Sequence, residues 1–224
     1  MVFPTSTAPP SWCLVVPVKL LAHAKTRLAG LAGARRAELA LAFAADTITA
    51  ALRCPRVVEV IAVSDDPRAR ELLTGLGATV VPDEPDAGLN PALAHGAAVA
   101  SERRPACGVA ALSADLPALR PDELARALDA AAGHRRAFVP DAAGVGTTLL
   151  AAAPRAPLEP SFGGRSRDRH RHQGAYELVL PGIDSVRRDV DTEADLAAAL
   201  ALGVGARTAA VLAELGGSPR PAEP

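Results

Sequence analysis

Aromatic residues and surplus charge are both scarce in this 224-residue sequence. Phe, Trp and Tyr together make up 3% of the chain, which argues against a stacking platform for single-stranded nucleic acid. The formal net charge is −1, so no overall field attracts the protein to nucleic acid or to an anionic membrane. We therefore expect neither nucleic acid nor a membrane among its partners.

Cysteine is also infrequent, and its spacing matches no metal site. Cys13, Cys54 and Cys107 form no C-x-x-C pair, so neither a disulfide framework nor a zinc signature is present. Cys13 and Cys107 fall in predicted strands, where we expect them to be small core residues. No apolar run is long enough to span a bilayer, and residues 1–11 lack the features of a signal peptide. We expect a cytoplasmic protein.

Three fingerprints of common enzyme classes are missing. Neither G-x-G-x-x-G nor G-x-x-x-x-G-K followed by Ser or Thr occurs, so the usual loops for dinucleotides and nucleoside triphosphates are absent. The nucleophile elbow G-x-S-x-G is missing as well, which argues against a Ser/His/Asp hydrolase. Any nucleotide chemistry must therefore use a different arrangement of residues.

Hydrophobic residues make up 49% of the chain, and short apolar runs alternate with helically spaced segments. The runs predict strands at Trp12–Val16, Val57–Val63, Ala78–Val81 and Cys107–Leu112. The helical spacing predicts helices between them, at Arg35–Leu52, at Arg68–Leu76 and in a segment that ends at Glu102. This alternation predicts an α/β fold with a doubly wound, mostly parallel sheet and right-handed crossovers.

The second half of the chain continues the pattern. Further strands are predicted at Ala137–Pro140, Thr147–Ala152 and Glu177–Leu180, and further helices at Pro121–Ala132, Ser166–Ala175, Glu193–Leu202 and Ala206–Leu215. Asp66 before a proline, and Thr192 with Asp195 three residues later, are typical of helix N-termini. We expect one domain over residues 12–215, with flexible ends at residues 1–11 and 216–224.

Lysine occurs twice, as Lys19 and Lys25, although the chain has 24 basic residues. Both lysines and Arg27 follow the first predicted strand, at the end where ligands bind in open α/β sheets. An ammonium group is a compact charge that suits a phosphate which moves during reaction. The placement favours a polyphosphate site, while two solvated lysines on an ordinary loop are the alternative.

Carboxylates occur in two further segments. Asp115 lies in the loop that follows the predicted strand Cys107–Leu112, and Asp189 and Asp191 stand two residues apart before a predicted helix. Mg²⁺ is commonly held by one or two carboxylates together with phosphate oxygens, so these residues are candidate metal ligands. The alternatives are that Asp115 stabilises a turn and that Asp191 supports the N-terminus of the following helix.

Two glycine-containing segments offer backbone N–H groups to an anion. Residues 144–148 (GVGTT) lie between two predicted strands, and residues 162–166 (FGGRS) open a predicted helix. A simple turn between strands is the alternative for the first segment. The basic run at residues 165–172 is interpreted as a solvated face or a funnel for anions, since the net charge does not favour nucleic acid.

Six stretches, taken in order, resemble the 2-phospho-L-lactate guanylyltransferase family of coenzyme F-420 biosynthesis, including its phosphoenolpyruvate-using members. The resemblance runs from about Leu14 to Leu215 and implies a nucleotidyltransferase fold of the glycosyltransferase-A type, with a mixed sheet of seven or so strands. The stretches are PVKLLAHAKTRL (17–28), LNPAL (89–93), ADLPAL (114–119), GVGTTLL (144–150), FGGRSRDRH (162–170) and DVDTEADL (189–196).

The resemblance implies roles for individual residues. Candidate Mg²⁺ ligands are Asp115 and Asp189, with Asp191 as a third. The phosphoenolpyruvate or phospholactate would be held by Thr147, Gly163 and Ser166. The nucleotide would be bound by Lys19, Lys25, Arg27 and Asn90, and Lys25 would join Asp115 and Asp189 in catalysis. Val145 departs from the family, whose members often carry Thr between the two glycines.

The implied reaction is attack of the acceptor's phosphate on the α-phosphorus of GTP, with release of pyrophosphate, and a downstream transferase of the pathway would use the product. Two other functions stay open. One is a molybdopterin or sugar-phosphate nucleotidyltransferase of the same fold, although the usual glycine-rich loop after the first strand is absent. The other is a non-catalytic nucleotide-binding module.

Overall fold

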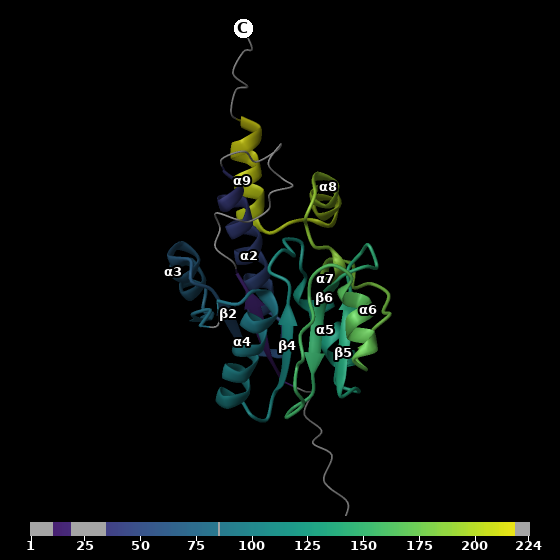
Figure 1. Ribbon diagram of the computed structural model, residues 1–224. Coiled ribbons are helices and arrows are strands. Elements are labelled where there is room, and N and C mark those ends of the chain that lie inside the picture. The colour runs from purple at the N-terminus through teal and green to yellow at the C-terminus, as the bar shows by residue number, and fades with distance from the viewer. Residues whose placement is uncertain (1–10, 19–34, 85, 218–224) are drawn as a thin grey trace, which may run out of the picture.

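The structure, a computed structural model, describes residues 11–18, 35–84 and 86–217. Within these residues, the chain forms one mixed sheet covered by helices on both faces (Figure 1). The strands are β1 (Trp12–Pro17), β2 (Val57–Val63), β3 (Thr79–Val81), β4 (Gly108–Leu112), β5 (Arg136–Pro140), β6 (Thr147–Ala152) and β7 (Tyr176–Glu177). The helices are α2 (Arg36–Leu52), α3 (Pro67–Gly75), α4 (Leu89–Arg103), α5 (Pro121–Ala131), α6 (Ser166–His172), α7 (Asp184–Arg187), α8 (Glu193–Leu202) and α9 (Ala206–Gly217).

The strand order is β3-β2-β1-β4-β6-β5-β7. The first four strands in this order are parallel, whereas β6 runs antiparallel to both β4 and β5. The prediction of a mixed, mostly parallel α/β sheet is therefore confirmed. Because β6 is reversed, its first residue lies beside the carboxyl end of β4, and the Ser113 N–H donates to the Thr148 carbonyl over 2.8 Å.

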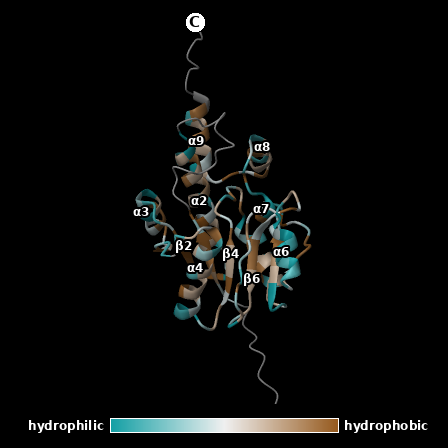
Figure 2. Cartoon of the chain, viewed as in Figure 1, coloured by the Kyte–Doolittle hydropathy of each residue, from teal (hydrophilic) through white to brown (hydrophobic). Residues whose placement is uncertain are grey.

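The central strand β1 is buried on both faces, as its continuous apolar run predicts. Leu14 and Val16 pack with residues of α2, α3 and α5, while Cys13 and Val15 pack with α4 on the opposite face. A third cluster joins α2 to α8 and α9. Figure 2 shows the apolar residues concentrated in the strands, whereas α6 is mostly hydrophilic.

The bounds of β2, β6 and α8 agree with the predicted ranges, and two helix starts form as expected. The Asp66 side chain accepts from two N–H groups of α3, and Thr192 and Asp195 form a capping box at α8. Other predictions need correction. The helix α6 ends at His172, β7 is two residues long, and α7 was not predicted.

The cysteines follow the prediction in part. Cys13 is fully buried, and burial together with the nearby Cys107 thiol raises its pKa to about 12. Cys107 is half-buried and precedes β4, so its assignment to a buried strand was wrong. All three cysteines are free thiols. No helix in the described parts of the chain is long and apolar enough to cross a membrane.

Close packing of α4 on the sheet depends on Gly96. A Cβ atom at this position would lie 2.5 Å from Val15 Cγ1 and 2.8 Å from Val63 Cγ2. Since the core has no room for it, Gly96→Ala should lower the free energy of unfolding by roughly 1–3 kcal/mol.

The matched control is Gly75→Ala at the last position of α3, where an added Cβ meets no atom within 4 Å. This substitution should be neutral or raise the free energy of unfolding by up to about 1 kcal/mol, because Ala is the better helix former. Urea denaturation of both variants makes the comparison. Equal effects of the two substitutions would contradict the packing described for α4.

Candidate active site

The carboxylates of Asp115 and Asp189 lie close together at the carboxyl end of β4. We call this region the acidic corner. The Val190 N–H donates to the Asp115 carbonyl over 3.0 Å, so the segment that carries Asp189 is bonded to the loop after β4. The 73 residues between the two aspartates therefore do not keep them apart. The prediction that they belong to one site is consistent with this geometry.

The electrostatics of this corner are unfavourable to a second negative charge. Burial, and after it the charges of Asp115, Asp141 and Asp191 in that order, together raise the pKa of Asp189 from its ordinary 3.8 to about 7. A carboxyl group that is partly buried among other carboxylates keeps its proton unless a cation compensates the charge. The corner is thus suited to a cation.

No three His, Cys, Asp or Glu side chains of the described residues converge closely enough to form a metal site on their own. The two carboxylates of Asp115 and Asp189 still fit Mg²⁺, because this ion keeps several waters and is typically held by one or two carboxylates plus phosphate oxygens of a substrate. Asp115 and Asp189 supply such oxygens, and a phosphorylated substrate would supply the others.

Asp191 is exposed, next to the start of α8. The N-cap of that helix is Thr192, whose hydroxyl accepts from the Asp195 N–H. The Asp191 backbone N–H donates to the same Asp195 carboxylate, over 3.3 Å. Thr192 is thus the N-cap, while Asp191 lies where its charge can support the N-terminus of α8, the alternative role given above. The Asp191 charge also lies close enough to raise the pKa of Asp189.

Asp141 is a member of this corner that the sequence did not reveal. Its carboxylate accepts from the Val145 N–H over 2.8 Å and from the Gly146 N–H over 2.7 Å, which closes the turn before β6. A Cβ at Gly146 would lie 2.5 Å from the Asp141 carboxylate, so any other residue there would displace this carboxylate from its two hydrogen bonds. An Asp at the start of a glycine-containing turn is the signal that could have identified this role.

The residues predicted to hold the phospho-acid come from β6 and α6. Thr147 and Ser166 are the buried first residues of these two elements. They are linked because the Arg167 N–H donates to the Val145 carbonyl and the Thr147 hydroxyl lies 3.0 Å from the His170 ring. Gly163 is exposed with a φ of +95°, a conformation that favours glycine.

Asn90 connects α4 to the glycine loop. Its side-chain carbonyl accepts from the Phe162 N–H over 2.7 Å, and its amide donates to the Phe162 carbonyl over 3.2 Å. These two bonds fix the backbone immediately before Gly163. Contact between Asn90 and a nucleotide stays a prediction, since both ends of its amide are already used in holding Phe162.

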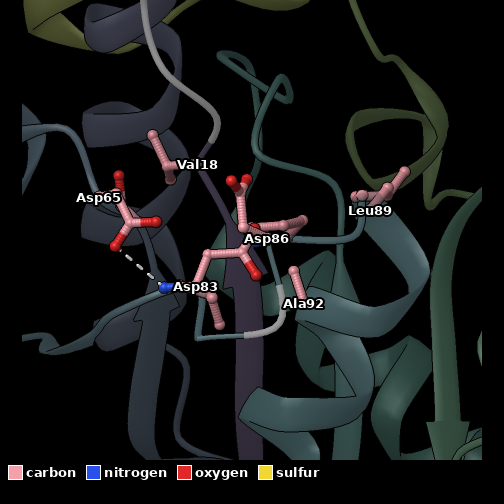
Figure 3. Close-up of a pocket in the computed structure, with 10 residues that line it drawn as sticks. Val18, Asp65, Asp83, Asp86, Leu89 and Ala92 are labelled. Atoms are coloured by element: carbon pink, nitrogen blue, oxygen red, sulfur yellow. Dashed lines mark hydrogen bonds between the residues drawn. The ribbon is translucent and has the colours of Figure 1, made fainter.

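A cavity of about 200 Å³ opens at the carboxyl ends of β1, β2 and β3 (Figure 3). Val18, Leu89 and Ala92 give it apolar walls, and Asp65 and Asp83 line it with carboxylates. The Asp65 carboxylate accepts from the Asp83 N–H over 3.1 Å, the bond drawn as a dashed line in Figure 3. Among the described residues, the buried Oδ1 of Asp83 has no hydrogen-bond partner.

Lys19, Lys25 and Arg27 lie outside the described residues, so their predicted contact with a triphosphate stays a prediction. Val18, the residue before Lys19, lines the cavity.

The basic run at residues 165–172 is not a uniform solvated face. Arg165 and Asp168 form an exposed ion pair of 2.7 Å, while Arg167 and Arg171 both pair with Glu177. His170 is completely buried, and burial lowers its pKa to about 4. Two carboxylates thus pair with three of the four arginines of this run, and its role as a funnel for anions stays a prediction.

Comparisons with solved structures agree on the fold. A cytidylyltransferase from Leptospira borgpetersenii superposes with a TM-score of 0.56 at 12% identity, covering 92% of this chain and 94% of that chain. The CMP:2-keto-3-deoxy-manno-octonic acid synthetase complexed with CTP gives a TM-score of 0.55 at 17% identity, covering 86% and 98%. The fold is therefore that of the α/β nucleotidyltransferases.

The chain belongs to the family described as "Guanylyl transferase CofC like", which matches residues 12–223. The phosphoenolpyruvate guanylyltransferase of Thermomonospora curvata is 64% identical over 205 residues, covering 92% of this chain and 90% of the relative. The protein of the same name from Streptomyces coelicolor is 63% identical, covering 91% and 97%. The chain is thus a nucleotidyltransferase enzyme, as the resemblance implied.

The raised pKa of Asp189 predicts how stability changes with pH when divalent cations are absent. The folded chain binds this proton more tightly than the unfolded chain, so the free energy of unfolding falls as the pH rises from about 4 towards 7. Asp189→Asn removes the destabilisation that comes from ionising Asp189 in the folded chain. It should raise the free energy of unfolding near pH 8 by roughly 1–4 kcal/mol, with little effect near pH 4.

Chemical denaturation in the presence of a chelator, at both pH values, measures the effect. Asp122→Asn is the control, because the Asp122 side chain on α5 is 71% exposed. A destabilising effect of Asp189→Asn near pH 8 would contradict the electrostatics described for this corner.

Proposed function

We propose that this enzyme transfers GMP from GTP to phosphoenolpyruvate and releases pyrophosphate, as a step of coenzyme F-420 biosynthesis. Relatives at 60% identity and above that bear the name phosphoenolpyruvate guanylyltransferase support this acceptor. 2-Phospho-L-lactate is the alternative acceptor. A cytoplasmic location and a downstream transferase as consumer of the product stay predictions.

The observation that carries the proposal is the pairing of Asp115 with Asp189 beside the buried Thr147. The strand order places β4 between β1 on one side and β6 on the other. The acidic corner at the end of β4 therefore lies between the cavity beyond β1–β3 and the segments of β6 and α6 that are predicted to bind an anion. Two reactants that occupied these two places would meet at the carboxylates.

Mg²⁺ is the cofactor that fits this corner. Asp115 and Asp189 would hold it, with Asp191 as a third carboxylate at the rim, since each provides the hard oxygen ligands that Mg²⁺ prefers. When bound, the ion would neutralise negative charge on the phosphate groups that react. It would also keep Asp189 ionised at neutral pH, because a nearby cation lowers a raised carboxyl pKa.

The residues of the chain would mainly bind and orient the reactants. Thr147, Ser166 and the backbone at Gly163 would hold the phospho-acid, and Lys19, Lys25 and Arg27 would bind the triphosphate. A phosphate monoester is already anionic near neutral pH, so its oxygen needs no strong general base to attack phosphorus. The rate enhancement would come from alignment and from charge stabilisation.

Loss of either carboxylate should abolish most of the activity. Asp115→Asn and Asp189→Asn should each lower kcat for pyrophosphate release from GTP and phosphoenolpyruvate by about two orders of magnitude or more, as losing a preorganised electrostatic contact does. Circular dichroism should show both variants folded, and Asp122→Asn should retain wild-type rates. Turnover within a few-fold of wild type in either variant would reject its assignment as a metal ligand.

The cavity also offers a reason for a preference for guanine. The Watson–Crick edge of guanine carries two adjacent N–H donors where adenine has an acceptor, and a carboxylate is the complementary group. Asp83 lines the cavity and has a buried oxygen without a partner among the described residues. This supports GTP as the nucleotide.

Asp83→Asn should therefore lower the ratio of kcat/KM for GTP to that for ATP by about ten-fold or more. Asp86→Asn removes an exposed carboxylate from the same cavity and serves as the comparison for a simple loss of charge. Mass spectrometry of the products from a panel of nucleotides and phospho-acids identifies the natural pair. Equal effects of the two substitutions would contradict base reading by Asp83.

A further inference from the structure

His170 is a buried histidine whose hydrogen-bond partners define the position of its proton. Its ring is fully buried on α6. The Ser161 backbone N–H lies 3.0 Å from Nε2, and the Thr147 Oγ1 lies 3.0 Å from Nδ1. A backbone N–H is always a donor, so Nε2 must be the acceptor and cannot carry a proton.

The ring is therefore neutral and protonated on Nδ1. Burial lowers its pKa to about 4, with smaller effects from the charges of Arg169 and Arg136. Phe162 packs edge-on against the ring at 5.1 Å, and Phe138 packs tilted at 5.8 Å, which completes its apolar surroundings. In a neutral imidazole one nitrogen donates and the other accepts, so Nδ1 donates to the Thr147 hydroxyl.

This assignment also orients the Thr147 hydroxyl. Its oxygen accepts from His170, which leaves its own hydrogen to be donated to another group. Among the described residues, the hydroxyl has no other hydrogen-bond partner. The reverse orientation would require a proton on Nε2 and would place two donors, Nε2–H and the Ser161 N–H, against each other.

We propose that His170 is a positioning residue that presents the Thr147 hydroxyl as a hydrogen-bond donor to an anionic group of the phospho-acid substrate. This inference rests on the proposed function, in which Thr147 contacts the acceptor. His170 does not itself touch the reactants. It lies behind Thr147 and, through Ser161, also holds the backbone that leads into the glycine loop.

The two hydrogen bonds of His170 can be separated by substitution. In His170→Asn the amide nitrogen lies near the former Nδ1, so this variant keeps the hydrogen bond that orients Thr147. In His170→Gln the side-chain carbonyl lies near the former Nε2, so this variant keeps the hydrogen bond that holds the loop at Ser161.

Steady-state kinetics with both substrates compares these variants. His170→Gln should raise the KM for phosphoenolpyruvate by about ten-fold or more, as loss of a hydrogen bond to a charged group does, and leave the KM for GTP within about two-fold. In His170→Asn, which keeps the donation to Thr147, the KM for phosphoenolpyruvate should rise at least about three-fold less than in His170→Gln. Equal effects of the two variants, or a parallel rise in the KM for GTP, would overturn the proposal.

A double-mutant cycle tests whether His170 acts through Thr147. Thr147→Val removes the hydroxyl at nearly constant shape, and Thr147→Ser retains it. His170→Gln should add little in the Thr147→Val background but should retain its full effect in the Thr147→Ser background. Additive effects in both backgrounds would overturn a role through the hydroxyl.

Nitrogen-15 NMR of the wild-type imidazole tests the proposal without turnover or variants. The spectrum should show a neutral ring protonated at Nδ1, and a proton on Nε2 would overturn the proposal. A wild-type protein that transfers no GMP to any phospho-acid would reject the proposed function. With normal wild-type transfer, failure of the substitution pattern would reject the role of His170 alone.

Discussion

The candidate site depends on two carboxylates, those of Asp115 and Asp189, that the fold holds next to each other. Asp115 and Asp189 are anchored through the hydrogen bond between the Val190 N–H and the Asp115 carbonyl, and burial together with the neighbouring carboxylates raises the pKa of Asp189 to about 7. Such an arrangement costs stability in the free protein, and a bound cation would offset this cost. We interpret the corner as a site whose electrostatic cost is balanced by its substrates and their metal.

The reversed direction of strand β6 explains why the acidic corner has Thr147 on one side and the cavity on the other. In a fully parallel sheet the first residue of β6 would lie at the far edge, away from Asp115. The antiparallel pairing with β4 brings Thr147 to the same edge as the carboxylates, while the cavity lined by Val18 and Asp83 opens beyond β1, β2 and β3. With the reactants in the two proposed places, the mixed topology would separate them and keep the carboxylates between them.

Local sequence patterns were sufficient to predict most helices and strands. They were insufficient to predict the hydrogen bonds between polar side chains at the candidate site. The cap at Asp66 was predictable because Asp and Pro act within one helical turn. Asp115 and Asp189 were predicted as metal ligands because the first follows a buried strand and both belong to stretches that resemble the family. Asp141 and His170 were not identified, since their roles depend on turns and on Thr147, Ser161 and other partners that only the folded chain brings together. The lysines lie outside the described residues.

The central claim is that a divalent cation joins Asp115 and Asp189 to the phosphate groups of the reactants. Mn²⁺, a spectroscopic substitute for Mg²⁺, allows this contact to be observed directly by pulsed electron paramagnetic resonance. With phosphoenolpyruvate bound, the account predicts phosphorus-31 hyperfine coupling to protein-bound Mn²⁺ that is lost in Asp189→Asn. Bound Mn²⁺ without such coupling, or coupling that persists unchanged in Asp115→Asn and Asp189→Asn, would contradict it.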